Sequence, residues 1–343
     1  MRGAISIRRL DINIGGGRKE MVQFDLVMPV VADDLAVLRH FEWDIRRQIP
    51  YRYLILIGNG QVQERLGQMN SQRVRFINED DLVPYDKIKN IISEMTDGDV
   101  QATARTGWYL QQFLKMEYSR RCKDEYYLLW DSDTVPLKSV QLFEDGKPIF
   151  HLKTEKHLLY FDTLKALFPN ISNTLEQSFI AEHMLIKTDI MKKMILDIEK
   201  NSAIKGCTFY EKILFAINKE DLKGSGFSEF ETYGNYCLTN FADVYKLKQW
   251  NSLREGSKYF DKELFGEREI EWLHDEYDAV SFEKTIRKMY GYSVFHRKSI
   301  QEKFSFEKVR KVMEIYHVIV RGLNRLGRMI KGDFRTYGEA YNK

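Results

Sequence analysis

The sequence Tyr126-Tyr127-Leu128-Leu129-Trp130-Asp131-Ser132-Asp133-Thr134-Val135-Pro136 decides the expected fold. Its first five residues form an uninterrupted apolar run, which predicts a buried strand. Pro136 cannot continue a central ladder, so we expect Asp131 and Asp133 at the carboxyl end of this strand. Open α/β sheets bind their ligands at that edge. Two converging carboxylates there are typical of a Mg²⁺ or Mn²⁺ site that ligand phosphates complete. The alternative is an ordinary Asp-rich turn, whose side chains satisfy freed backbone groups.

The flanking segments repeat a pattern of strand followed by helix. Apolar runs at 24–30, 53–57 and 74–77 predict strands, and Thr106–Arg121 has apolar residues at helical spacing. This alternation predicts an α/β fold: a mixed sheet with mainly parallel N-terminal strands and flanking helices. The second half is less regular. It predicts strands at 148–152, late in 178–186 and at 292–296, and helices at 189–199, 209–218 and from 306 to about 331.

The composition narrows the function. Lys and Arg number 53 against 50 Asp and Glu, a formal net charge of +3, so the chain is not expected to bind nucleic acid. Its three widely spaced cysteines make neither a disulfide framework nor a zinc site. We therefore expect a cytoplasmic protein without a signal peptide or a membrane span. The expected organisation is an N-terminal segment (1–21), a catalytic domain (22–300) and a C-terminal basic amphipathic helical extension (301–343).

Three stretches in order carry a family resemblance: GWYLQQFLK at 107–115, LWDSDT at 129–134 and FSEFETYG at 227–234. Together with the preceding strand–helix units, they resemble the GT-A class of nucleotide-sugar glycosyltransferases. More specifically, they resemble a poorly characterised bacterial family associated with surface polysaccharide assembly. The resemblance covers roughly residues 22–300. It implies a GT-A-like sheet and sugar transfer from a nucleoside-diphosphate sugar to a glycan or lipid-linked acceptor.

The resemblance also implies roles for the two aspartates. In GT-A enzymes such a pair binds a divalent ion, Mn²⁺ or Mg²⁺, that bridges the donor diphosphate. Asp133 is then the direct ligand, and Asp131 contacts the ribose or reaches the ion through water. Many of these enzymes add a late histidine to the metal, and His296 matches in order and setting. A histidine at the end of a strand is also often only a hydrogen-bonded surface residue.

Other donor contacts are expected from the end of the first strand and from the helix before the metal strand. The candidates are Pro29, Val30, Asp33, Gln111 and Lys115. The alternative for Asp33 or Asp34 is capping of the following helix, which needs no ligand. The apolar residues of 107–115 are expected to pack in the core.

The acceptor side rests on the third stretch. An inverting transferase needs a base for the acceptor hydroxyl, and Glu229 and Glu231 at an expected helix start are the candidates. Ser228 and Glu231 also form a capping-box pattern, which favours Glu229 as the base. His183 and Tyr233 are candidate acceptor contacts, although Tyr233 fits the core equally well. The His-x-x-Gly-x-x-Lys pattern of a large retaining family is absent, so inversion is favoured.

Two other functions compete. Asp131-Ser132-Asp133-Thr134-Val135 also matches haloacid-dehalogenase-type phosphatases, with Asp131 as the nucleophile. That motif normally follows the first strand of its domain, and no convincing downstream metal motif is present. The second alternative is a non-catalytic membrane adaptor. The stretch from 306 to 331 is basic and amphipathic, as in helices that lie on an anionic membrane, possible here at the inner leaflet. It could equally pack on its own domain.

Overall fold

The computed structural model describes residues 22–67, 72–171 and 175–330, with side chains of the last helix up to residue 325. The chain divides into two compact units, which meet between Asn251 and Ser252. The expected boundary near residue 300 falls inside the second unit. The expected N-terminal segment and the end of the C-terminal extension lie outside the described residues.

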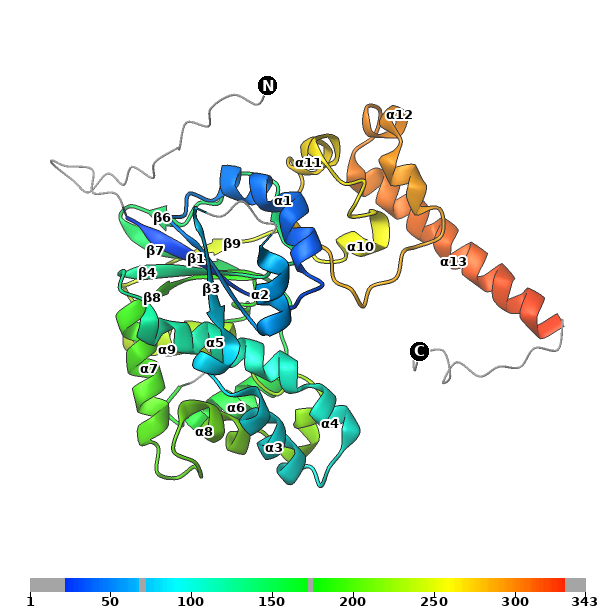
Figure 1. The fold of residues 1–343 in the computed structure, drawn as a ribbon. Coiled ribbons are helices and arrows are strands. Elements are labelled where there is room, and N and C mark those ends of the chain that lie inside the picture. Colours follow the sequence, from blue (N-terminus) through cyan, green and yellow to red (C-terminus); the bar gives the residue numbers. More distant parts are fainter. Residues whose placement is uncertain (1–21, 68–71, 172–174, 331–343) are drawn as a thin grey trace, which may run out of the picture. The chain divides into compact units, whose positions relative to one another are not determined.

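A five-stranded sheet is the centre of the first unit (Figure 1). Its spatial order is β3-β2-β1-β4-β8, in which the first four strands are parallel and β8 pairs antiparallel with β4. The bounds are β1 (Phe24–Pro29), β2 (Leu54–Gly58), β3 (Val74–Asn78), β4 (Tyr126–Trp130) and β8 (His183–Lys187). The predicted α/β class and mixed sheet are confirmed.

The order of the strands creates a switch point between β1 and β4. From β1 the chain builds outward through β2 and β3, whereas β4 is added on the other side of β1. At such a point the loops at the carboxyl ends of the two strands diverge and leave a crevice in which α/β proteins bind ligands. The loop after β1 and the turn after β4 flank this point.

Helices cover both faces of the sheet. One face packs its apolar side chains against a large cluster that includes residues of α3, α5, α7, α8 and α9, and Figure 1 shows these helices gathered on one side of the sheet. The helices of the unit are α1 (Leu35–Gln48), α2 (Gly60–Leu66), α3 (Tyr85–Met95), α4 (Val100–Ala104), α5 (Thr106–Arg121), α6 (Leu159–Leu167), α7 (Thr188–Lys200), α8 (Phe209–Ala216) and α9 (Glu229–Asn240), with 3₁₀ turns η1 (Glu79–Asp81) and η2 (Lys219–Lys223).

Short strands complete the first unit. β7 (Lys147–Leu152) pairs antiparallel with β6 (Phe143–Glu144) and parallel with β9 (Lys246–Gln249). β5 (Thr134–Pro136) follows the Asp-Ser-Asp turn directly.

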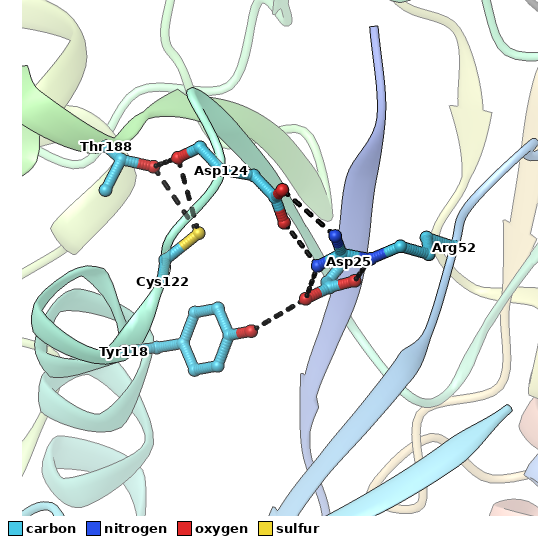
Figure 2. A network of polar contacts seen from close by, with 6 residues as sticks. All are labelled: Asp25, Arg52, Tyr118, Cys122, Asp124 and Thr188. Carbon is cyan, nitrogen blue, oxygen red and sulfur yellow. Dashed lines mark hydrogen bonds and ion pairs between the residues drawn. The ribbon is translucent and has the colours of Figure 1, made fainter.

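A polar network ties the amino ends of β1, β2 and β4 together (Figure 2). The guanidinium of Arg52 donates to both oxygens of Asp25, at 3.1 and 3.0 Å, and to both oxygens of Asp124. The hydroxyl of Tyr118 donates to Asp25 at 3.2 Å. Asp25 is only 5% exposed. A buried carboxylate is stable only when it is paired and hydrogen-bonded. Arg52 therefore stabilises this edge of the sheet by pairing with Asp25 and Asp124.

Replacing Arg52 by Met is therefore expected to destabilise the protein. The change leaves Asp25 and Asp124 close together without their shared cation. Breaking a buried pair costs about 3–5 kcal/mol. The Arg52 side chain is 36% exposed, so we expect roughly 2–3 kcal/mol after solvent screening. Chemical denaturation measures this loss, with Lys123→Met at a nearby exposed residue as control. Equal midpoints for the two variants would contradict the assignment.

The second unit has its own aromatic core. Phe306 packs against Phe260, Phe295 and Trp272 with ring centroids 5.4–5.7 Å apart. Its elements are β10 (Ser252–Leu253), α10 (Gly256–Tyr259), α11 (Glu267–Leu273), β11 (Ala279–Ser281), η3 (Tyr292–His296), α12 (Lys298–Gln301) and α13 (Phe306–Ile330). The strand predicted at 292–296 is instead the 3₁₀ turn η3. It follows Gly291, whose φ of +77° lies in the left-handed region and breaks the extended chain.

The start of α13 is buried, and its later part is exposed. Phe306, Val309 and Met313 are buried, so the start of the helix belongs to the core of the second unit. Further along, five exposed apolar side chains share one face of the helix, whereas Val318, 69% exposed, lies to one side of it. The five are Val312, Ile315, Tyr316, Ile319 and Leu323, each 48–66% exposed. The helix predicted from 306 is confirmed. No described helix has the length and apolar character that crossing a membrane requires.

Candidate functional site

The turn after β4 presents the two predicted aspartates at the carboxyl edge of the sheet. Trp130, the last residue of β4, is fully buried, whereas the Asp131 side chain is 31% exposed. The backbone N–H of Thr134 donates to the carbonyl of Asp131 at 3.1 Å and closes the turn. Asp133 is half-buried and accepts from the Thr134 hydroxyl at 3.3 Å. Both carboxylates are thus held at the switch point with partial access to solvent.

The loop after β1 reaches the same turn. Pro29 and Val30 are buried at the strand end, and Asp33 is exposed and pairs with Arg65 at 3.3 Å. Asp34 occupies the N-cap position of α1 but makes no side-chain cap hydrogen bond. It instead accepts from the Ser132 hydroxyl at 3.3 Å. The capping alternative therefore does not hold for Asp34, which links the two loops across the switch point.

Lys115 lies beneath this turn. Its ammonium is 2.8 Å from Oδ1 of Asp131 and 2.8 Å from Oε1 of Glu229, and its side chain is only 3% exposed. Burial alone would lower the pKa of Lys115, but the carboxylates of Asp131 and Glu229 raise it above its ordinary value. The ammonium is therefore charged and paired with two carboxylates, and its predicted contact with donor phosphates stays a prediction. Gln111, one turn earlier on α5, is half-buried.

Glu229 is the first residue of α9 and is 1% exposed. Burial raises its pKa, and the nearby ammonium of Lys115 opposes that rise. Oε1 of Glu229 is 2.8 Å from the ammonium of Lys115, and Oε2 has no hydrogen-bond partner among the described residues. A buried carboxylate with spare acceptor capacity beside the site is suited to accept a proton.

Glu231 has different surroundings. Its carboxylate accepts from the hydroxyl of Ser178 at 2.9 Å, the backbone of Phe179 at 3.1 Å and the amide of Asn235 at 3.1 Å. Ser228 caps the helix by accepting from the backbone of Glu231, but the Glu231 side chain does not complete the box. Glu231 therefore fixes the 178–179 segment against α9, which suits a structural residue better than a base.

The predicted acceptor contacts are buried. Nδ1 of His183 donates to the carbonyl of Ala181 at 2.7 Å, which leaves Nε2 to accept from Nδ1 of His151 at 2.8 Å. Burial and the neighbouring His151 hold the pKa of His183 well below its ordinary value, so the ring is neutral. Tyr233 is 0% exposed, and its hydroxyl is 2.8 Å from that of Tyr245. The structure thus places both rings in the core, and their predicted contacts with the acceptor stay predictions.

His296 lies in the second unit. Its Nε2 accepts from the backbone N–H of Asp261 at 2.9 Å. Its Nδ1 is 3.4 Å from Oε1 of Glu269 and makes no hydrogen bond with the described residues. The predicted place of His296 on the ion stays a prediction.

Sequence reasoning missed Glu182. Its φ of +52° is rare for a residue other than glycine, and such strain concentrates at functional sites. Its carbonyl accepts from the backbone of Asp131 at 2.9 Å, and its carboxylate binds Lys153 at 2.7 Å and the indole of Trp250 at 3.2 Å. Glu182 therefore fixes the start of the Asp-Ser-Asp turn. No pattern in the sequence predicts a left-handed backbone at Glu182.

The donor atoms at the turn fit a metal only together with a ligand. The described residues contain no cluster of three His, Cys, Asp or Glu side chains that could hold an ion by themselves. Mg²⁺ and Mn²⁺, however, are usually bound through one or two carboxylates plus substrate phosphates. Asp131 and Asp133 fit that arrangement, which requires the diphosphate to supply the remaining oxygens.

Comparison with known proteins identifies the family. A model described as a family of unknown function, DUF6492, matches residues 38–296. The chain belongs to this family. No curated protein matches the DUF6492 chain.

Several solved structures are similar to this DUF6492 protein, among them the following three. Mouse xyloside xylosyltransferase 1 is 13% identical, with 68% of this chain and 88% of that chain covered and a TM-score of 0.39. Core-mannan synthase A from Aspergillus fumigatus, in its Mn/GDP form, is 10% identical, with 72% and 79% covered and a TM-score of 0.40. The galactosyltransferase LgtC, in complex with donor and acceptor sugar analogs, is 10% identical, with 79% and 94% covered and a TM-score of 0.38. Such TM-scores are too low to assign a function.

Proposed function

We propose that this protein is a metal-dependent, GT-A-type glycosyltransferase. It moves a sugar from a nucleoside-diphosphate donor to a glycan or lipid-linked acceptor in surface polysaccharide synthesis, with inversion at the anomeric carbon. The observation that carries the proposal is the position of Asp131 and Asp133. They end a central parallel strand at the switch point between β1 and β4, where an α/β sheet binds nucleotides.

Each residue near the switch point has its own role in this proposal. Asp133 and Asp131 would hold Mn²⁺ or Mg²⁺ together with the donor diphosphate, and the ion would neutralise charge on the leaving group. The loop with Pro29, Val30 and Asp33 would contact the nucleotide, as would Gln111 on α5. Glu229 would take the proton of the acceptor hydroxyl. The acceptor oxygen then bonds to the anomeric carbon, the bond from that carbon to the phosphate oxygen breaks, and the nucleoside diphosphate leaves.

The phosphatase alternative is not favoured. The phosphatase motif normally follows the first strand of its domain, whereas here it follows β4, the fourth strand of the chain.

Calorimetric titration of the wild-type protein with UDP, GDP, ADP and CDP tests the proposal. We expect at least one diphosphate to bind when Mn²⁺ is present and its binding to weaken sharply when EDTA removes the ion. Each corresponding nucleotide sugar is then assayed for hydrolysis or transfer. If none of the four binds in the presence of Mn²⁺, the proposed donor site is contradicted, and the adaptor alternative is favoured.

We also propose that α13 brings the enzyme to the inner face of a membrane that carries lipid-linked acceptors. Its exposed apolar face is flanked by exposed basic side chains, including Lys308, Lys311 and Arg325. Apolar contact with lipid combined with attraction to anionic headgroups is the usual mode of interfacial helices. Each basic residue near such a surface contributes about 1 kcal/mol, and salt screens that attraction.

Vesicle binding tests this location. Replacing Ile315, Ile319 and Leu323 by Gln is expected to weaken binding to anionic vesicles at least about tenfold, because three apolar side chains no longer enter the lipid. Wild-type binding should also fall as salt is raised. Substitutions are sharper than truncation at Ser305, which would remove Phe306 from the aromatic core. Equal binding of the triple variant and the wild type would contradict the proposal.

A further inference from the structure

A single ammonium connects the proposed donor site to the buried carboxylate behind it. Lys115 comes from the middle of α5, Asp131 from the turn after β4 and Glu229 from the first turn of α9. The ammonium is 2.8 Å from an oxygen of each carboxylate. It also lies 4.5 Å from the ring centroid of Phe230, which covers another side of it. The ammonium group is therefore fixed by three elements at once.

The two carboxylates differ in their access to solvent. Glu229 is 1% exposed and faces the interior, whereas Asp131 is 31% exposed and faces the crevice. A buried cation needs a counter-charge, and Glu229 supplies one from within the fold. Lys115 therefore does not depend on Asp131 for its neutralisation, and its contact with Asp131 orients a carboxylate that points toward a ligand.

We propose that Lys115 is a positioning residue for the donor. Its ammonium holds Oδ1 of Asp131, which directs the other oxygen toward the bound nucleotide, and it offsets the negative charge that a diphosphate meets at this turn. Asp34, linked to Ser132 in the same turn, adds a further carboxylate that the anionic donor must approach. This inference rests on the proposed donor site.

The proposal predicts opposite effects on two ligands. Removing a cation next to Asp131 makes the turn more negative, so the affinity for Mn²⁺ alone stays equal or increases. The same change weakens the binding of a nucleoside diphosphate, which loses both the oriented carboxylate and the compensating charge. A general loosening of the fold would weaken both ligands together.

The experiment must separate the role of Lys115 in donor binding from its contribution to the stability of the fold. Lys115→Met alone would leave Glu229 buried without a counter-ion, which destabilises the fold. The informative variant is Lys115→Met combined with Glu229→Gln, which removes both buried charges. It is compared with Glu229→Gln alone, in which Lys115 still contacts Asp131. Lys212→Met is the matched control, because Lys212 is 4% exposed and, within the described part of the chain, its ammonium binds the carbonyls of Asn201 and Ile204 and no carboxylate.

Calorimetry of the full-length variants uses Mn²⁺ alone, and UDP, GDP, ADP and CDP at saturating Mn²⁺. Relative to Glu229→Gln, the double variant is expected to bind the diphosphate at least about tenfold more weakly, the scale of one charge-assisted contact, and to bind Mn²⁺ equally well or better. Equal diphosphate affinity, or parallel weakening of both ligands, would overturn the inference and leave the proposed function intact. Failure of the wild type to bind any of the four diphosphates would overturn both.

Discussion

Replacing Glu229 by Gln is expected to lower the rate of sugar transfer by a factor of about 10²–10⁴, the contribution typical of a general base. Gln keeps the size of the side chain and can still accept a hydrogen bond from Lys115, so the fold should persist. The amide cannot take a proton. The pKa of Glu229 is raised by burial, which gives the carboxylate greater affinity for the proton that the acceptor releases. Single-turnover transfer with the donor found by calorimetry measures the loss.

Glu229 is 1% exposed, so the prediction requires the segment ahead of α9 to move when the acceptor binds. Two observations would contradict the role of Glu229 as the base. Unchanged transfer by Glu229→Gln would show that another group removes the proton. A product that retains the anomeric configuration would show that no base acts on the acceptor in this manner. Glu231→Gln is the matched comparison, because Glu231 lies two residues later with its carboxylate fully hydrogen-bonded. The Glu231→Gln variant is expected to be less stable than the wild type, while its rate of sugar transfer changes little.

The central elements of the fold could be predicted because residues of a different chemical type mark their ends. β4 ends where an apolar run meets Asp131, and β1 ends at Pro29, as expected from the sequence. α5 spans Thr106–Arg121 as predicted. The run at 292–296 is too short for periodicity to separate a strand from another buried segment, and the left-handed Gly291 ahead of it decided the outcome.

The candidate site could be predicted only in part. Asp131 and Asp133 are one residue apart and follow the same strand end, so a local pattern locates them. The contact of Lys115 with Glu229 depends on how α5 and α9 pack, which the sequence does not state. Lys115 was expected to reach donor phosphates because it lies on the helix before the metal strand, but in the structure its ammonium pairs with two carboxylates. Tyr233 likewise follows the packing of α9, and its polar hydroxyl finds partners inside the core.

Replacing Asp133 by Ala is expected to abolish the Mn²⁺-dependent binding of the nucleoside diphosphate. Loss of a residue that only supports a metal ligand already weakens a site by about 10–100-fold, so loss of a direct ligand should weaken it by at least about 100-fold. Asp133 is half-buried at the surface turn, and its removal relieves repulsion from the neighbouring carboxylates. The melting temperature without ligand should therefore stay nearly unchanged, which separates a binding defect from misfolding.

Two further variants sharpen that measurement. Asp133→Asn keeps the shape and the hydrogen bond from Thr134 but removes the charge, so it reports how much of the loss is electrostatic. Asp162→Ala, at an exposed position on α6, controls for the removal of a surface carboxylate and should bind as the wild type does. If Asp133→Ala binds the diphosphate normally in Mn²⁺, the ion is held elsewhere, and the turn after β4 is a structural Asp-rich turn. If binding is lost in Asp133→Ala and largely kept in Asp133→Asn, the carboxylate acts through its shape and not as an ionic ligand.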